Sequence, residues 1–251
     1  MAILTYVLIG LALRVFSFSF NLKRRLQIIS RWTKRFNKFL TGLLGIKIIT
    51  EGDRAPLNKE GNFIISNHLG YLDGIILGSL FGVIYISKEE VKKWPLFGWM
   101  AQVGATIFID RRNKLGSIGY IQEVTAALKA KANILLFPEG TSTNGEKLPP
   151  FQSIHFQSPI NAKSPVLPLC ITYSKINSEN VDIKNRDKVC WYGQVNFFCH
   201  IQQALKLHSI EARVKIYPEI EPETFSRDGY TRKELSRELY DTIAPNYPLF
   251  N

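Results

Sequence analysis

The sequence has few residues of the kinds that build disulfide frameworks and metal sites. Its 251 residues include three cysteines and four histidines. The cysteines are odd in number and form no C-x-x-C pair, so they indicate neither a disulfide framework nor a zinc ribbon, and they favour a reducing, cytosolic setting. A G-x-x-x-x-G-K-[ST] loop is absent, which excludes a Walker-type nucleotide site. Internal repeats and low-complexity tracts are absent too.

Apolar residues and positive charge are both plentiful. Apolar side chains make up 45% of the chain and aromatic ones 12%, which is enough to bury a core. The net charge of +11 and the pI near 9.6 predict an acidic partner, which would be nucleic acid, an anionic membrane surface or a phosphorylated substrate. Charge alone does not choose among these partners.

Residues 1–44 are predicted to bind a membrane. Residues 2–20 are almost wholly apolar apart from Arg14, are about as long as a bilayer-spanning helix, and lack the features of a cleaved signal peptide. Residues 23–44 interleave basic and apolar side chains, as in an amphipathic helix at an anionic surface. We therefore expect a membrane-associated protein at the cytoplasmic face of the inner (plasma) membrane, with residues 2–20 spanning it or lying in it. The alternative is a hydrophobic helix packed on the domain, and in that case deleting residues 1–20 unfolds the protein.

Residues 45–251 alternate short apolar runs with helical patterns, which predicts one α/β domain. Strands are expected over residues 46–50, 62–66, 83–87, 105–110, 133–137, 166–173, 189–198 and 212–220. Helices are expected over residues 72–81, 116–131, 200–208 and 231–243, with an irregular one over 89–100.

The stretch ISNHLGYLDG, residues 65–74, interrupts an apolar run and places His68 five positions before Asp73. A neutral imidazole accepts a proton near pH 7, and a carboxylate that fixes its tautomer makes it a better base. The pair is expected at a strand-to-helix turn, where ligands bind in open α/β sheets. A buried histidine satisfied by its neighbours is the structural alternative. A metal site is weaker, because none of the other histidines stands at a ligand spacing from His68.

Two further strand ends carry polar residues. Residues 105–110 run into Arg111 and Arg112, where a guanidinium either forks onto phosphate oxygens or forms an ordinary solvated pair. Residues 133–137 run into PEGTSTNG, whose backbone N–H groups and hydroxyls suit an anion or an oxyanion, unless the segment is a plain polar turn.

Four segments, in order, make the chain resemble the bacterial lysophospholipid acyltransferases over about residues 45–243. The family's motifs appear here as Asn67-His68-Leu-Gly-Tyr-Leu-Asp73, Gly104-Ala-Thr-Ile-Phe108-Ile-Asp110-Arg111, Phe137-Pro138-Glu139-Gly140-Thr141-Ser142-Thr143 and Val166-Leu-Pro168-Leu. Each motif is weak alone, but four in order are specific. The resemblance implies a glycerol-phosphate-acyltransferase-like α/β domain with a mixed, mostly parallel sheet flanked by helices.

The resemblance also implies a mechanism and its substrates. His68 is the general base that deprotonates a lysolipid hydroxyl, and Asp73 orients its ring. The acceptor is expected to be 1-acylglycerol 3-phosphate, giving phosphatidic acid, and the acyl donor a thioester of coenzyme A or acyl carrier protein. The implied partners are therefore membrane lipids, this lysophospholipid and the thioester, without a cofactor, a metal or nucleic acid. The residues expected to bind substrate are Asn67, Arg111, Phe137, Glu139, Gly140 and Thr141, with Arg111 on the phosphate and backbone donors near Gly140 for the oxyanion.

One departure from the family pattern leaves the acceptor open. Many members carry F-K-x-G-x-F after the third motif, whereas this chain reads Phe151-Gln152-Ser-Ile-His155-Phe156. The missing lysine leaves room for another head group, such as that of a lyso-ornithine lipid or another lysophospholipid. From a different class, a non-catalytic basic module that binds membranes or nucleic acid is the alternative, although charge binding does not need His68 or Glu139 inside apolar runs.

Overall fold

The computed structural model describes residues 2–94, 97–110, 114–225, 229–248 and 250. At its centre lies one sheet, whose strands are β1 (Ile46–Glu51), β2 (Phe63–Ser66), β3 (Val83–Lys88), β4 (Ile107–Ile109), β5 (Asn133–Leu136), β6 (Val166–Ile176), β7 (Glu179–Asn180) and β8 (Ile210–Ile216). The strand order is β1-β8-β6-β2-β5-β3-β4, with β7 paired to β6. All pairs are parallel except those of β6 with β8 and with β7. The predicted mixed, mostly parallel sheet is confirmed.

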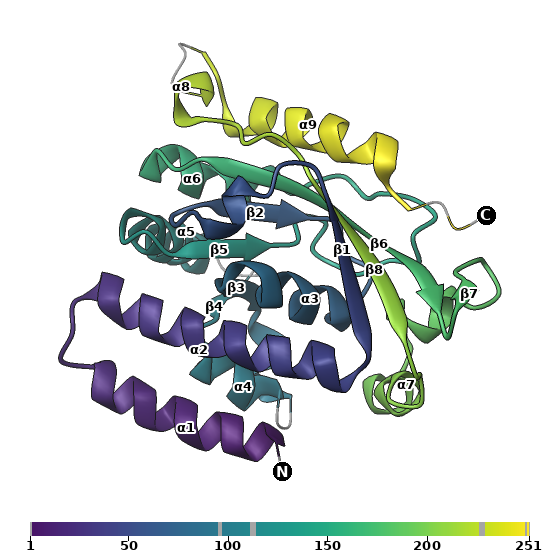
Figure 1. The fold of residues 1–251 in the computed structure, drawn as a ribbon. Helices are drawn as coiled ribbons and strands as arrows, with labels where there is room; N and C mark the ends of the chain where they lie inside the picture. The colour runs from purple at the N-terminus through teal and green to yellow at the C-terminus, as the bar shows by residue number, and fades with distance from the viewer. Residues whose placement is uncertain (1, 95–96, 111–113, 226–228, 249, 251) are drawn as a thin grey trace.

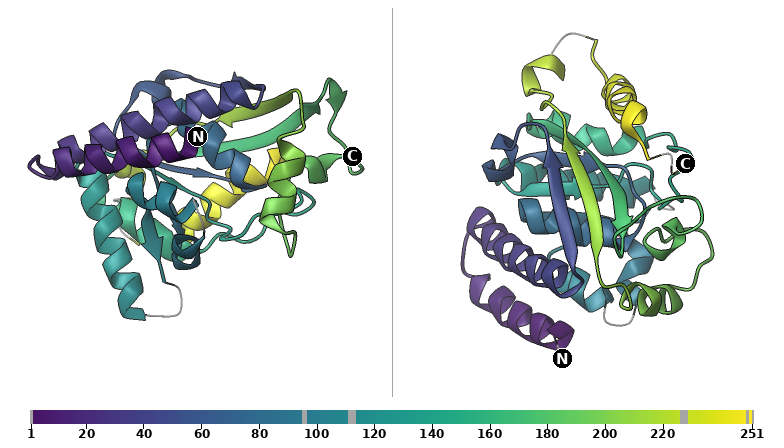
Figure 2. Two further views of the ribbon diagram at one scale, coloured as in Figure 1. Left: turned by 90° about the horizontal axis from the view of Figure 1, so that it is seen from below. Right: turned by 45° about the vertical axis from the view of Figure 1, so that its right-hand side comes forward.

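Helices flank this sheet (Figure 1). They are α1 (Ala2–Ser17), α2 (Leu22–Leu43), α3 (Tyr71–Phe81), α4 (Phe97–Val103), α5 (Lys114–Lys129), α6 (Gln157–Ala162), α7 (Phe197–Ala204), α8 (Pro222–Phe225) and α9 (Arg232–Ile243). Figure 2 shows α9 at the opposite end of the molecule from α1 and α2. Strand β2 is buried on both faces: Phe63 and Ile65 join the core formed with α5 and α9, whereas Ile64 joins the core formed with α3. Such burial accounts for the continuous apolar run before the polar motif.

The strand predicted over residues 189–198 is wrong. Residues 189–196 form no strand, and α7 begins at Phe197. Four of the side chains in this segment are aromatic, and the rings pack on each other and on α3: the Trp191 and Phe197 ring centroids lie 5.6 Å apart, and Phe197 lies 5.1 Å from Tyr71 of α3. An aromatic cluster therefore satisfies the apolar pattern without any sheet pairing. The short helix α6 was not predicted, because its sequence is rich in proline and polar residues.

The two N-terminal helices lie against the rest of the protein. Tyr6 of α1 is buried in a cluster with Phe36 of α2 and Val103 of α4. The Arg14 guanidinium donates a hydrogen bond to the carbonyl of Gln102, in the last turn of α4, where a cation is favoured. The other face of α1 is exposed and apolar and carries Leu4, Leu8, Leu11, Val15 and Phe16. Within the described ranges, no helix combines the length and the apolar character needed to cross a membrane.

Candidate active site

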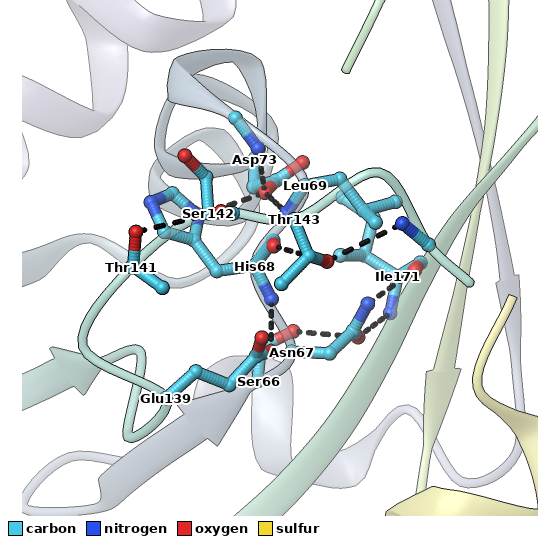
Figure 3. Close-up of polar contacts among 12 residues, drawn as sticks. Ser66, Asn67, His68, Leu69, Asp73, Glu139, Thr141, Ser142, Thr143 and Ile171 are labelled. Atoms are coloured by element: carbon cyan, nitrogen blue, oxygen red, sulfur yellow. Dashed lines mark hydrogen bonds and ion pairs between the residues drawn. The ribbon is translucent and has the colours of Figure 1, made fainter. Parts of the chain in front are cut away.

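The predicted histidine and aspartate meet at the turn between β2 and α3 (Figure 3). The His68 Nδ1 lies 2.9 Å from Asp73 Oδ2, and the same oxygen accepts hydrogen bonds from the backbone N–H groups of Leu69 (2.6 Å) and Gly70 (2.8 Å). Asp73 is the third residue of α3, so its carboxylate reaches back over the helix start as in a capping box. A carboxylate acceptor requires that Nδ1 carry the proton, which leaves the lone pair on Nε2. The ring is therefore set up as a base.

Gly70 allows a distant segment to touch this turn. A Cβ placed on Gly70 would lie 2.9 Å from the backbone nitrogen of Trp191. The Trp191 N–H donates to the carbonyl of Leu69 at 2.8 Å. The close approach requires glycine, and it attaches the segment that carries Trp191 to the motif.

Asn67 joins the end of β2 to β6. Its side chain is fully buried, its Nδ2 donates to the Ile171 carbonyl (2.9 Å), and its Oδ1 accepts from the Ile171 N–H (2.7 Å). The backbone ladder between these strands ends at Ser66 and Leu169. The amide therefore continues the pairing where the backbone of β2 turns away. The sequence assigned Asn67 to substrate binding, but both of these contacts are with the backbone of β6.

Glu139 supports His68 from the other side. Its Oε1 accepts a hydrogen bond from the His68 backbone N–H at 2.7 Å, and its buried Oε2 has no hydrogen-bond partner in the part of the chain that the structure describes. Burial raises the pKa of Glu139 to about 9, against the effect of that hydrogen bond, and the nearby Asp73 raises it further. At pH 7 the Glu139 side chain is therefore a neutral acid that accepts a hydrogen bond from the His68 backbone N–H.

This shift predicts how stability depends on pH. The folded protein holds a proton on Glu139 that the unfolded chain releases near pH 4.5, so the stability that this proton provides is lost as the pH rises toward about 9. We expect Glu139→Gln to keep an oxygen that accepts from the His68 N–H, and to remove the loss of stability with rising pH. Urea unfolding at several pH values should show the wild type losing stability relative to the variant as the pH rises through this range. Exposed Glu179→Gln is the control, and parallel curves for the wild type and Glu139→Gln would contradict the prediction.

A cavity of about 250 Å³ opens beside the His68 ring. The Phe137 ring stacks on the imidazole with centroids 4.0 Å apart and an interplanar angle of 14°. The His68 carbonyl accepts a hydrogen bond from the Thr143 N–H at 3.0 Å, so backbone and ring are both held. The described wall of the cavity is formed by His68, Ile86, Ser87, Lys88, Val91, Trp94, Ile109, Leu136, Phe137, Gly140, Thr141, Ser142, Trp191, Tyr192 and Gly193. A larger open hollow of about 470 Å³ on the surface of α9 contains none of the predicted site residues.

The structure divides the predicted site residues into two groups. His68, Phe137, Gly140 and Thr141 line the cavity, whereas Asn67, Asp73 and Glu139 are buried and hold the backbone or the ring. The Gly140 N–H, near which we expected oxyanion donors, donates to the Phe137 carbonyl at 3.1 Å. Arg111, predicted to bind phosphate, lies outside the described residues.

Sequence reasoning missed residues that reach the site from distant segments. Trp94 and Trp191 form part of the cavity wall, and their rings meet edge to face with centroids 5.7 Å apart. Tyr173 of β6 donates to Asp73. The strand predicted over residues 166–173 includes Tyr173, but neither the strand pattern nor the family motif assigned it a contact with the site.

Comparison with known proteins gives consistent matches. A family model described as Acyltransferase matches residues 47–172. The lyso-ornithine lipid O-acyltransferase of Rhizobium meliloti (strain 1021) is 27% identical over 224 residues, covering 85% of this chain and 74% of that protein. The protein of the same name from Pseudomonas aeruginosa is 29% identical, and the match covers 80% of this chain and 74% of that protein. The 1-acyl-sn-glycerol-3-phosphate acyltransferase of Escherichia coli (strain K12) is 32% identical, covering 55% of this chain and 58% of its own.

A solved structure shares the fold. The crystal structure of the 1-acyl-sn-glycerophosphate (LPA) acyltransferase PlsC from Thermotoga maritima matches with a TM-score of 0.65 and 19% sequence identity. The match covers 96% of this chain and 88% of that one. The match therefore extends over nearly the whole chain.

Proposed function

Because the chain belongs to the acyltransferase family, we propose that it transfers a fatty acyl group from a thioester to the free hydroxyl of a lyso-lipid. One observation carries the proposal: the imidazole of His68, held at Nδ1 by the buried Asp73 at 2.9 Å, lies in the wall of a cavity. A non-catalytic basic module has no use for such a pair.

The proposed reaction proceeds directly between the two substrates. His68 Nε2 takes the hydroxyl proton of the lyso-lipid, and the oxygen attacks the thioester carbonyl to form a tetrahedral oxyanion. Collapse of this intermediate breaks the C–S bond, and the thiolate leaves with the proton that His68 returns. Asp73 stabilises the imidazolium in between. The aromatic and aliphatic wall excludes water, which would otherwise hydrolyse the thioester.

Two acceptors are proposed, each favoured by a different observation. The relatives that match at least four fifths of the chain act, by name, on lyso-ornithine lipid, and Gln152 stands where many family members have a lysine. The four motifs favour 1-acylglycerol 3-phosphate, and so do the names of the relatives that match about half of this chain. We place lyso-ornithine lipid first because that match extends over more of the chain.

A direct assay separates these acceptors and the donors. Purified protein in detergent is incubated with lyso-ornithine lipid, 1-acylglycerol 3-phosphate or an uncharged monoacylglycerol, and with acyl-CoA or acyl carrier protein thioester. Mass spectrometry of the lipid then identifies the acylated product. Acylation of lyso-ornithine lipid alone supports the first acceptor, and acylation of 1-acylglycerol 3-phosphate alone supports the second. Thioester hydrolysis without any acylated lipid would overturn the proposed function.

The protein is proposed to work on the cytoplasmic face of a membrane, where its lipid substrate resides. The exposed face of α1 is apolar, and the neighbouring helix α2 carries exposed Lys23, Arg24, Arg31 and Arg35. Apolar and basic surface together favour an anionic bilayer. The same basic surface suits the acidic acyl carrier protein as a donor.

Charges placed on that face should release the protein from lipid. We expect the double variant Leu8→Glu with Val15→Glu to bind anionic vesicles at least about 10-fold more weakly, since each apolar side chain withdrawn from lipid costs about 1.5–3 kcal/mol. Both side chains point away from the packed face, so the fold and the activity in detergent should persist. Ile183→Glu, an equally exposed residue between β7 and α7, is the control. Equal vesicle binding by all three proteins would contradict the prediction.

A further inference from the structure

Asp73 has a second support that the motif does not contain. One carboxylate oxygen, Oδ2, faces His68 Nδ1 and two backbone N–H groups, and the other, Oδ1, accepts a hydrogen bond of 2.5 Å from the hydroxyl of Tyr173. Tyr173 is 1% exposed and Asp73 is fully buried, so water cannot replace this donor. We propose that Tyr173 is a positioning residue for acyl transfer, which acts on His68 by holding Asp73. The inference rests on the proposed function for its activity test only.

The chemistry of the pair fixes which group donates. Burial, and next the negative charge of Asp73, raise the pKa of Tyr173 well above its usual value of 10. The phenol therefore keeps its proton throughout the range in which the protein would work. A hydrogen bond donated to a buried carboxylate spreads its negative charge and restricts its rotation.

The position of Tyr173 on β6 makes the support rigid. Tyr173 pairs with Ala212 of β8 in the antiparallel ladder, and its ring is buried in the core shared with α3. Two residues earlier, Ile171 is held to the β2 end by the Asn67 side chain. Strand β6 thus holds both Asn67, at the end of β2, and the Asp73 carboxylate. A shift of β6 would move both His68, which follows Asn67, and Asp73.

The other titratable groups near Asp73 are neutral at pH 7. Glu139, at the end of β5, has a pKa raised to about 9 by burial. Burial also raises the pKa of Tyr71 on α3, of Tyr247 near the C-terminus and of the Cys190 thiol before α7. Among the described residues, Lys88 lines the same cavity as His68, but the carboxylate that contacts the imidazole is that of Asp73. A change in the hydrogen bonding of Asp73 is therefore read out at the imidazole.

Tyr173→Phe removes the hydroxyl and keeps the ring. We expect kcat to fall about 10- to 100-fold, which is the range for a hydrogen bond to a charged group, with KM changed less than about threefold. A carboxylate with one donor fewer holds the imidazolium proton more strongly. The acid limb of the pH profile should therefore move to higher pH, and so should the midpoint of the His68 ring titration measured by NMR.

Two comparisons separate positioning from a general loss of stability. Tyr240→Phe on α9, whose hydroxyl donates to the Leu148 carbonyl, should leave kcat and the acid limb unchanged. Tyr173→Phe should also have little further effect in an Asp73→Asn background, because residues that act through one another are not additive. Unchanged kcat in folded Tyr173→Phe, a loss of kcat without the pH shift, or full additivity with Asp73→Asn would each overturn the inference.

Two further measurements keep the test decisive. If Tyr173→Phe does not fold, fluorotyrosine at position 173 provides a more acidic donor in place, and the His68 titration midpoint should then move to lower pH; an unchanged midpoint overturns the inference. The NMR titration needs no substrate. Failure of the acyl-transfer assay together with the predicted NMR shifts would therefore count against the proposed function and not against the link between Tyr173 and His68.

Discussion

His68→Ala is expected to abolish acyl transfer while the protein stays folded and bound to membranes. The imidazole lies at the cavity and is the proposed base, and a positioned general base contributes about 10²- to 10⁴-fold to a rate. The side chain is 21% exposed and its main packing contact is the stacked Phe137 ring, so its loss should destabilise the fold only modestly. The measurement is product formation with the preferred acceptor, alongside vesicle binding and urea unfolding of the same preparation.

A second histidine provides the matched control for this variant. His208 is exposed and precedes β8, away from the cavity, and His208→Ala should retain full activity. If His68→Ala is as active as the wild type, the mechanism is wrong. If it is inactive because it has unfolded, the urea curve will show it.

Asp73→Asn should cost nearly as much as losing the base. An amide in this position can donate to Nδ1 and so favour the tautomer with the proton on Nε2, where it blocks the base; in a comparable triad this exchange lowers kcat about 10⁴-fold. We expect a loss of about 10²- to 10⁴-fold in kcat with a smaller effect on KM. The measurement is steady-state kinetics for both substrates.

The alanine variant at the same position should differ in stability. Asp73→Ala also leaves the N–H groups of Leu69 and Gly70 buried without their acceptor, and an unsatisfied buried group costs about 1–3 kcal/mol. Asp73→Ala should therefore unfold at lower urea than Asp73→Asn, and Asp241→Asn on the exposed side of α9 is the control for both. Equal activity of Asp73→Asn and the wild type would show that the carboxylate does not orient the base.

The parts of the site that sequence reasoning predicted are local in the chain. Asn67, His68 and Asp73 lie within seven positions, and a buried strand followed by a helix start fixes their relation through backbone geometry. The strand end at residue 137 and the family pattern both pointed to the segment from Phe137 to Thr141, three of whose residues, Phe137, Gly140 and Thr141, do line the cavity.

The parts that escaped prediction depend on contacts between distant segments. Tyr173 sits in a strand that was predicted, but nothing in a strand pattern says which residue of the opposite turn a hydroxyl will meet. Residues 189–198 were misassigned because an aromatic cluster and a strand give similar apolar patterns over a few residues. The close approach at Gly70, where this segment touches the motif, has no local sequence signal.

The two ties between the motif and β6 also bear on the order of events during synthesis. Asn67 contacts a residue 104 positions later, and Asp73 one 100 positions later. A ribosome-bound chain that ends before β6 therefore carries the whole first motif without the strand that holds it. Since domains fold as units while synthesis proceeds from the N-terminus, the apolar α1 emerges well before an active base can form. If α1 binds the membrane as proposed, a chain that follows this order would meet the membrane first and become competent for the proposed transfer only afterwards.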